Sequence, residues 1–569
     1  MGKLRLTNNA KLILKRFLAK DIKGKIIETP KDMFKRVAKN IASIDKKYEG
    51  TLQAKKSEKE FFEVMTNLEF LPNIPVLANA GRPLQQLAAC FVLPVPDDLG
   101  GIFQAIKEMA LIQKSGGGTG FSFSRLRPEG SRVADTGGIA SGPVSFMKVF
   151  DAATGAIKEG GIRRGANMGI LSIEHPDIEK FISCKRCGDF PNFNISVALT
   201  DKFIKNLKKN QSYELIDPHS KKTTKRKKAE DIFNLICKNA WYNGEPGVIF
   251  IDTINKHNPT PKEKIEATNP CGEQPLLPYE SCDLGSINLS KITEKGGINY
   301  DRLGELVRIG VHFLDNCIDA SKFPLPKIEE KVKENRKIGL GIMGFADCLI
   351  KQEISYNSKE AIQQARKIMS FIQKEARQAS KKLAESREPF PNIKNSIYAK
   401  EKLRNATLTT IAPTGTIGII ADCSDGIEPL FNVIYQRYTT YRTITEFNAL
   451  FKKIAKKFKL TKKTLLEIAE KGTIKHTKLP GKIKEIFVTA HNIPIEQHIK
   501  IQAEFQKYTD NAISKTVNLP ENASVEDVKK TIILAHKLGC KGLTVYRDKS
   551  RKKQVLNLCK CKLNLSKLR

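Results

Sequence analysis

The chain has 569 residues, of which 40% are apolar and 28% are charged, a balance typical of a soluble globular protein with a sizeable core. It contains no run of 18 apolar residues, which argues against a transmembrane helix, and its first residues lack the apolar segment of a signal peptide. The length exceeds that of one average domain but suits an α/β barrel with insertions.

The net charge of +36, from 97 basic and 61 acidic residues, favours anionic partners such as nucleotides, nucleic acid or acidic surfaces. The lysines are spread over the whole length, and no stripe of arginine and aromatic residues is present. Solvated lysine faces therefore explain this charge better than a nucleic-acid groove does.

Twelve cysteines occur at spacings that do not form a disulfide framework. Without a signal peptide, the expected location is the reducing cytoplasm, where paired cysteines are more often catalytic or metal-binding than structural. None of the eight histidines has metal-ligand spacing, so no metal bound by protein side chains is expected.

Residues 1–70 are predicted to be a helical region. Thr29 and Pro30 have the composition of a helix start, with proline at the first helical position. Apolar residues recur at helical spacing over 33–38. The prolines of segment 71–75 break the pattern and open a stretch rich in loops.

Between residues 88 and 440, short apolar runs alternate with helical patterns, such as the run 247–251 and the amphipathic segment 301–320. This alternation predicts an α/β fold with buried strands. Glycine clusters, above all in 114–120, lie between the runs.

Residues 445–485 are rich in lysine and amphipathic, and we expect them to form a helical excursion at the periphery. Strand and helix patterns return over 487–546. The last residues, 548–569, form a basic tail without periodicity that contains Cys559 and Cys561.

The segment Asn269-Pro270-Cys271-Gly272-Glu273 sets an amide, a thiol and a carboxylate two residues apart on a short turn. The acidic neighbour is expected to raise the pKa of Cys271, which makes this thiol a poor thiolate nucleophile. A neutral S–H suits one-electron chemistry, in which the sulfur gives up a hydrogen atom. Alternation along an extended loop would make the three side chains converge on a substrate. A turn with a buried, inert thiol is the alternative that composition alone favours.

This turn, with the segment 279–289 that follows it, resembles the active-site sequence of the ribonucleotide reductases, most closely the adenosylcobalamin-dependent class II enzymes. The resemblance extends over about residues 6–555 and rests on several motifs in the same order. The supporting motifs are 28–30, 89–94, 115–120, 163–169, 335–341, 412–417, 426–431 and 542–547.

The resemblance implies a role for each of five catalytic residues. Cys271 would form the transient thiyl radical that takes the ribose 3′-hydrogen. Glu273 would take the 3′-hydroxyl proton, and Asn269 would hydrogen-bond the substrate. Cys90 and Cys282 would be the reducing pair that ends each turnover as a disulfide. A protonated thiol that carries a hydrogen atom, and two further thiols that supply two electrons, are chemically consistent roles.

The resemblance also implies the residues that contact the substrate. The loop 413–417 is predicted to bind phosphate through backbone N–H groups and hydroxyls, although such a turn alone is a weak signal. The expected substrate-binding residues are Val76, Ala89, Cys90, Gly118, Asn269, Pro270, Cys271, Gly272, Glu273, Pro413, Thr414, Gly415, Thr416 and Ile417.

The chain departs from the family pattern at several of these positions. The family usually has hydroxyl side chains where this chain has Ile74, Val76 and Ala89, which leaves the ribose and phosphate contacts open. Asp422 and Asp425 add acids where small residues are usual.

Two cysteine motifs lie outside the proposed site. Cys184 and Cys187 form a lone CxxC, which is half of a zinc site. Cys559 and Cys561 resemble the mobile C-terminal pair that re-reduces the active-site disulfide in many reductases, although CxC is not the usual spacing. The alternatives for the tail are a structural role, a truncated end, or completion of the zinc site.

The fold implied by the resemblance is a ten-stranded α/β barrel over residues 71–547, made of two antiparallel half-barrels, with Cys271 on a loop inside it. The reaction would convert a ribonucleoside di- or triphosphate to its 2′-deoxy form for DNA synthesis. Adenosylcobalamin would supply the radical, and a thioredoxin- or glutaredoxin-like donor would supply electrons. The family also implies a homodimer with a deoxynucleotide or ATP effector near residues 124–142.

Two other functions stay open. The same reaction could draw its radical from a separate metal-containing subunit, although the chain has no adjacent tyrosine pair of the kind that relays such radicals. A catalytically impaired, basic nucleotide- or nucleic-acid-binding paralogue would fit the charge and the altered residues Ile74, Val76 and Ala89. The intact cysteines argue against this second function.

Overall fold

The computed structural model describes residues 4–133, 137–157, 165–186, 188–294, 296–438, 443–551, 554 and 556–558. Within these ranges no helix has both the length and the apolar character that crossing a membrane requires.

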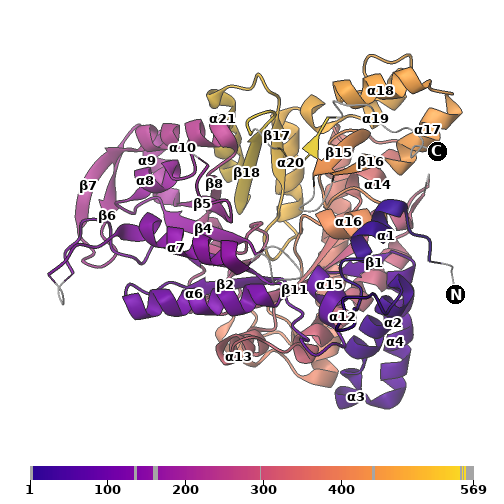
Figure 1. Ribbon diagram of the computed structural model, residues 1–569, viewed down its shortest axis with the longest axis horizontal. Helices are drawn as coiled ribbons and strands as arrows, with labels where there is room; N and C mark the ends of the chain where they lie inside the picture. Colours follow the sequence, from indigo (N-terminus) through magenta and orange to yellow (C-terminus); the bar gives the residue numbers. More distant parts are fainter. Residues whose placement is uncertain are drawn as a thin grey trace.

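The helices that open the chain are α1 (Asn8–Leu14), α2 (Pro30–Ala42), α3 (Asp45–Tyr48) and α4 (Gly50–Thr66). The predicted helix start at Thr29 is confirmed, because its side chain accepts from Asp32 N and the Asp32 carboxylate accepts from Thr29 N. The apolar face of α2 is buried, and α2 and α4 pack against α12 (Tyr300–Ala320), whereas α1 lies beside α16 (Gly415–Ala421) (Figure 1).

Five parallel strands form the first half of a barrel, in their order along the chain. They are β2 (Cys90–Pro94), β3 (Gly118–Ser122), β4 (Asn167–Ser172), β5 (Phe193–Leu199) and β8 (Gly247–Phe250). The connections contain α6 (Leu99–Lys114), α7 (Gly142–Ile157), α8 (Ile178–Ser183), α9 (Asp201–Lys208), β6 (Ser212–Ile216), β7 (Thr223–Lys228) and α10 (Ala229–Asn243). Parallel neighbours need such crossovers, and the helices lie on the outer face (Figure 1).

A second set of parallel strands completes the barrel. Its members are β11 (Ser281–Asn288), β14 (Ile338–Met343), the extended segment 408–411, β17 (Thr516–Leu519) and β18 (Gly542–Arg547). The segment 408–411 joins the two strand pairs, because Leu340 pairs in parallel with Thr409. Ile411 pairs with Ile513 in the same way. The connections include α12, α13 (Pro326–Asn335), α14 (Phe345–Lys351), α15 (Lys359–Arg387), α20 (Ile495–Gln506) and α21 (Val525–Lys537).

The two halves meet through antiparallel pairs, which close the sheet. β11 pairs antiparallel with β2, and β18 pairs antiparallel with β8. β1 (Phe70–Pro72) adds an antiparallel strand to the far end of β11. The ten-stranded α/β barrel of two antiparallel halves is thus confirmed, since each half contributes five strands to the ring.

A lobe beside the barrel has an apolar cluster of its own (Figure 1). Its elements are β15 (Ile434–Tyr438), β16 (Thr443–Phe447), α17 (Ala449–Lys457), α18 (Lys462–Lys471) and α19 (Gly481–Ile486). Phe451 and Ile468 are fully buried in this cluster, whereas most lysines of α17 and α18 are exposed. The three helices fall in the lysine-rich stretch for which the sequence predicts helices.

A buried ionic network fastens α3 to the helices of the barrel. The Arg387 guanidinium, fully buried at the end of α15, donates to Asp45 (2.7 Å) and Glu49 (2.8 Å). Its second nitrogen donates to Asn316 Oδ1 on α12 (2.6 Å). Burial by itself raises the pKa of Asp45, but hydrogen bonding and charge from His312 hold it well below its usual value. The carboxylate is therefore ionised and paired at neutral pH.

Replacing Arg387 with methionine should lower the free energy of unfolding by about 3–5 kcal/mol, because the change leaves Asp45 buried without this cation. Urea titration followed by circular dichroism measures the effect. Arg366→Met is the matched control, since Arg366 pairs with Glu504 but is largely exposed. This control should leave the unfolding midpoint nearly unchanged. Equal destabilisation by the two variants would contradict a stabilising role of the buried ion pairs of Arg387.

Candidate active site

The predicted active-site turn is the tip of a short β-hairpin formed by β9 (Ala267–Thr268) and β10 (Pro275–Leu276). Asn269 N donates to Gln274 O (3.1 Å), and the Asn269 side chain accepts from Gln274 N (3.0 Å). Gly272 adopts a φ of +81°, and its N–H donates to Asn269 O (3.0 Å). The tip is therefore a tight turn, and the extended alternation expected from the sequence stops at this glycine.

The hairpin lies inside the barrel, where both halves hold it. On one side, Thr268 O lies so close to Gly120 on β3 that a Cβ added to the glycine would be 1.7 Å from it. On the other side, Thr410 Oγ1 and Ala512 N donate to Glu273 O (3.0 and 2.9 Å). Because any side chain at Gly120 would collide with the hairpin backbone, this approach requires glycine.

The two other predicted catalytic cysteines face each other across the junction of the half-barrels. Cys90 on β2 and Cys282 on β11 are paired residues in the antiparallel register. Such pairs have Cα atoms about 4.5–5.5 Å apart, which suits a disulfide. Asn269 Nδ2 donates to Cys90 Sγ (3.0 Å) and so joins the pair to the hairpin. The structure thus brings Asn269, Cys90 and Cys282 together.

Exposure separates the three thiols. Cys271 at the tip is exposed, whereas Cys90 and Cys282 are 4% and 1% exposed. Burial raises the pKa of Cys282 well above its usual value, and nearby carboxylates, Glu273 among them, raise it further. Cys282 is therefore a protonated thiol at neutral pH. The expected effect of Glu273 on Cys271 stays a prediction.

Two further predicted substrate residues lie against the cysteine pair. Gly118 on β3 is the parallel partner of Cys90, and a Cβ there would lie 3.0 Å from the proline of the turn. Ala89 precedes Cys90, and its N–H donates to the backbone of β11 (3.3 Å). Val76 is placed differently, since it is fully buried in α5 (Ile74–Asn79) and belongs to the outer apolar core. The inner cluster that contains both cysteines includes Ala89 but not Val76.

The predicted phosphate loop, 413–417, follows the extended segment of the second half-barrel and leads into α16 (Gly415–Ala421). Thr414 adopts a φ of +52°, and its hydroxyl accepts from Gly426 N (2.8 Å), so this side chain shapes the loop. Three of the five loop residues are exposed or half-buried, whereas Ile417 is buried. Phosphate binding by the loop stays a prediction.

The structure accounts for one of the acids that depart from the family pattern. Asp425 accepts from Arg437 Nη2 (2.8 Å), and Arg437 Nε pairs with Glu446 (2.5 Å). Arg437 lies beside the phosphate loop, because a Cβ on Gly415 would be 3.4 Å from its Nη1. Asp425 therefore helps to balance the charge of a largely buried guanidinium. Nothing in the structure explains Asp422.

Three predicted cysteines lie outside the described residues: Cys187 of the CxxC motif, and Cys559 and Cys561 of the tail. Cys184, the described member of the CxxC motif, is half-buried, and burial raises its pKa to about 12. The zinc half-site and the thiol shuttle therefore stay predictions.

Two residues that support the hairpin were not singled out from the sequence. Asn194 on β5 donates through Nδ2 to Pro270 O (2.8 Å), and Thr410 holds the Glu273 carbonyl. Thr410 is a fully buried polar residue within a mostly apolar run, whereas Asn194 is exposed on β5. A polar side chain buried in such a run needs a hydrogen-bond partner, and this is the signal that would have found Thr410. No signal in the sequence singles out Asn194.

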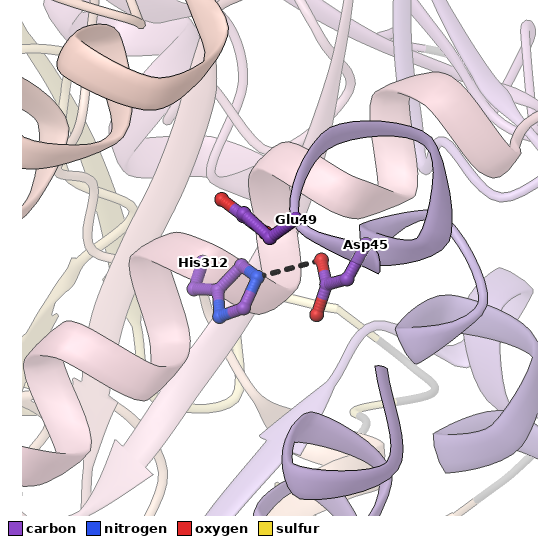
Figure 2. Close-up of side chains that lie close together, drawn as sticks. All are labelled: Asp45, Glu49 and His312. Atoms are coloured by element: carbon purple, nitrogen blue, oxygen red, sulfur yellow. Dashed lines mark hydrogen bonds and ion pairs between the residues drawn. The ribbon is translucent and has the colours of Figure 1, made fainter. Parts of the chain in front are cut away.

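One group of side chains within the described ranges has the composition of a metal site. Asp45, Glu49 and His312 each place one ligand atom within 4.8 Å of the others, and Figure 2 shows the hydrogen bond between His312 and Asp45. Arg387 donates to both carboxylates, and its Nη2 lies 2.9 Å from His312 Nε2. Because a guanidinium occupies this position, we interpret the group as part of the ionic network and not as a cation site.

Mild oxidation of the purified chain should join Cys90 to Cys282, because their cross-strand placement requires little backbone movement. Mass spectrometry of a non-reduced digest identifies the linked peptides. Cys237 and Cys540 are internal controls, since both are fully buried in apolar surroundings and should remain thiols. Recovery of Cys90 and Cys282 as separate thiols, under conditions that oxidise surface thiols, would contradict the predicted pair.

Comparisons with known proteins agree with this architecture. The family description "Ribonucleotide reductase, all-alpha domain" matches residues 4–85, and "Ribonucleotide reductase, barrel domain" matches residues 88–403 and 399–546. A relative named vitamin B12-dependent ribonucleoside-diphosphate reductase, from Thermoplasma acidophilum, is 47% identical to this chain, and the match includes 97% of this chain and 80% of the relative. A relative of the same name from Mycobacterium tuberculosis is 43% identical, and the match includes 97% of this chain and 81% of the relative. The fold is similar to that of the Actinobacillus ureae class Id ribonucleotide reductase alpha subunit, with a TM-score of 0.79 at 23% identity, over 96% of this chain and 97% of that one. The chain belongs to the ribonucleotide reductase family.

Proposed function

We propose that this chain reduces ribonucleotides to 2′-deoxyribonucleotides with adenosylcobalamin as its radical cofactor, and so supplies precursors for DNA. The observation that carries the proposal is the hairpin inside the barrel. It presents an exposed thiol, Cys271, while its Asn269 bonds the buried Cys90 of a cross-strand cysteine pair. The names of the relatives support the cofactor and favour diphosphate substrates.

The proposed reaction gives each residue of the group one task. Cys271, as a thiyl radical, takes the 3′-hydrogen atom of the ribose and returns a hydrogen atom at the end of the turnover. Glu273, 2% exposed on the hairpin, takes the 3′-hydroxyl proton while the 2′-hydroxyl leaves as water. Cys90 and Cys282 give up two electrons and two protons and become joined by an S–S bond. Asn269 connects the turn to the cysteine pair, because its side chain accepts a hydrogen bond from Gln274 N and donates one to Cys90 Sγ.

The exposure of Cys271 fits a cofactor that approaches the hairpin from outside. When bound, adenosylcobalamin supplies a radical by homolysis of its cobalt–carbon bond. So large a cofactor could not reach a fully buried thiol, but Cys271 is exposed, and so is Asn194, which holds the Pro270 carbonyl of the same turn. Cys271 and Asn194 form the part of the chain that the cofactor would approach.

The remaining partners follow from the family resemblance. A thioredoxin- or glutaredoxin-like dithiol would reduce the Cys90–Cys282 disulfide, with Cys559 and Cys561 as an intermediate shuttle. A homodimer would bind a deoxynucleotide or ATP effector near residues 124–142. The cytoplasmic location expected from the cysteine usage stays a prediction.

The purified chain, with adenosylcobalamin, a dithiol and a ribonucleoside diphosphate, should form the deoxynucleotide without a second protein. Cys271→Ala should abolish the product, because the 3′-hydrogen then has no acceptor. Cys237→Ala, which alters a cysteine of the outer apolar core, should retain it. An anaerobic chromatographic assay measures the deoxynucleotide. Product that requires an added radical-generating subunit would contradict the cobalamin proposal, and product from Cys271→Ala would contradict the thiyl mechanism.

Gly120→Ala should lower kcat/KM by about 100-fold, because the added methyl group displaces Thr268 O and with it the hairpin. Gly481→Ala is the matched control, since no atom lies within 4 Å of the Cβ it would add. The same deoxynucleotide assay applies, with circular dichroism to verify folding. Unchanged activity in Gly120→Ala would mean that this contact does not set the position of the hairpin.

A further inference from the structure

A buried ion pair that the proposed reaction does not use lies next to the cysteine pair. Lys337 Nζ donates to Glu280 Oε2 (2.6 Å), and the two side chains are 2% and 1% exposed. Glu280 also accepts from Leu277 N and from Asn335 Nδ2, both at 2.7 Å. The carboxylate is thus held by three donors and fixes the position of the Lys337 ammonium.

The two residues of this ion pair immediately precede neighbouring parallel strands, and both charges act on Cys282. Glu280 lies one residue before β11 and two residues before Cys282, and its charge raises the pKa of the Cys282 thiol. Lys337 immediately precedes β14, whose Ile338 is the parallel partner of Asp283. Lys337 and Cys282 immediately precede the two members of this pair, and the Lys337 charge lowers the pKa of Cys282. Glu280 and Lys337 therefore flank the thiol within the barrel.

The charges around Cys282 oppose one another. Burial raises the pKa of this thiol most, and Asp283, Glu280 and Glu273 raise it further, whereas Lys337 lowers it. Without Lys337, a thiolate at Cys282 would be opposed by burial and by all of these carboxylates. Lys337 is therefore the group that favours the departure of this sulfur as a thiolate.

Stability alone does not account for the ion pair. Burying an ammonium and a carboxylate costs several kcal/mol per ion, and a well-packed apolar pair of similar volume is often as stable. A lysine ammonium has three N–H donors. One of the three donors of Lys337 is used in the hydrogen bond to Glu280. This leaves donors for a thiolate or a water molecule.

A small cavity leads from Lys337 toward the surface. It has a volume of about 10 Å³, room for one water molecule. Its lining includes Lys337, Lys541, Pro275 of the hairpin and the exposed His257. Burial lowers the pKa of Lys541 to about 8, so this ammonium can exchange a proton with the cavity near neutral pH. The cavity therefore gives Lys337 a neighbouring site for proton exchange.

We propose that Lys337 protonates the Cys282 sulfur when the Cys90–Cys282 disulfide is reduced, an inference that rests on the proposed function. A thiolate of the external dithiol attacks Cys90 Sγ, the less buried sulfur, and a new S–S bond forms as the Cys90–Cys282 bond breaks. The electron pair leaves with Cys282 Sγ, which takes a proton from the Lys337 ammonium. The second thiol then displaces Cys90, which takes the proton that this thiol releases, and the dithiol departs as a disulfide. Water in the cavity returns a proton to Lys337, and Glu280 is the positioning residue.

The test measures re-reduction apart from the radical chemistry. The Cys90–Cys282 disulfide is formed by mild oxidation, dithiothreitol is added, and alkylated samples taken over time are analysed by mass spectrometry. Lys337→Met should re-reduce about 100-fold more slowly than the wild type, at the lower end of general acid catalysis. Lys337→Arg keeps the charge but does not release a proton, so it should restore only part of the rate. Once fully reduced, Lys337→Met should form as much deoxynucleotide in a single turnover as the wild type.

Two further variants guard against a purely structural effect. Lys515→Met removes another buried ammonium with a 2.6 Å carboxylate pair, to Glu428, and should re-reduce at the wild-type rate. The double variant Glu280→Gln with Lys337→Met leaves no orphaned carboxylate and should also be slow.

Each outcome bears on one claim. Wild-type re-reduction in Lys337→Met or in the double variant, an equal loss in Lys515→Met, or full recovery in Lys337→Arg would overturn the proton transfer. Absence of deoxynucleotide from the fully reduced wild type would instead overturn the proposed function, since re-reduction is measured without turnover.

Discussion

The close approach of the Thr268 carbonyl to Gly120 is the contact on which the site depends. β9 and β10 have two residues each, and a hairpin this short is not stable in isolation. Its position comes from the barrel around it, through Gly120 on one half and the donors Thr410 and Ala512 on the other. The strands of the barrel can therefore hold Cys271, the proposed reactive thiol, in a fixed position at the exposed tip of the hairpin.

The antiparallel junction of the half-barrels explains why the two cysteines of the proposed redox pair lie opposite each other. Cys90 begins β2 and Cys282 lies near the start of β11, and strands that run in opposite directions overlap there at their first residues. In a wholly parallel barrel, Cys90 and Cys282 would lie on strands that run in the same direction. The hydrogen bonds between such strands are evenly spaced and slanted, so the two cysteines would not be a directly opposed pair. The apolar inner cluster around them keeps Cys282 protonated, which suits a thiol that stores electrons until substrate is bound.

Local patterns and the family resemblance predicted much of this architecture, but not the contacts between distant segments. The capped helix start at Thr29 is a local signal, and the barrel follows from strand alternation together with the family resemblance. The bond from Asn194 to the turn and the pairing of Asp425 with Arg437 join segments that only the closed barrel brings together. The Arg387 network likewise joins three helices that are far apart in the sequence. Sequence pattern and composition do not show which distant segments become neighbours in the fold. These residues therefore look like ordinary polar positions until the fold is known.

The parallel direction of the second half-barrel also determines where its buried charges lie. Glu280, Lys337 and Lys541 each immediately precede a strand of this half, so they lie at the rim formed by the amino ends. Asp510 lines the same cavity as Lys337 and Lys541. The loop 413–417 follows the carboxyl end of the segment 408–411 and lies at the opposite rim. Substrate bound at that loop would close one rim without blocking the cavity at the other. The proposed proton supply to Cys282 and the predicted access of the ribonucleotide would then be separate paths through one barrel.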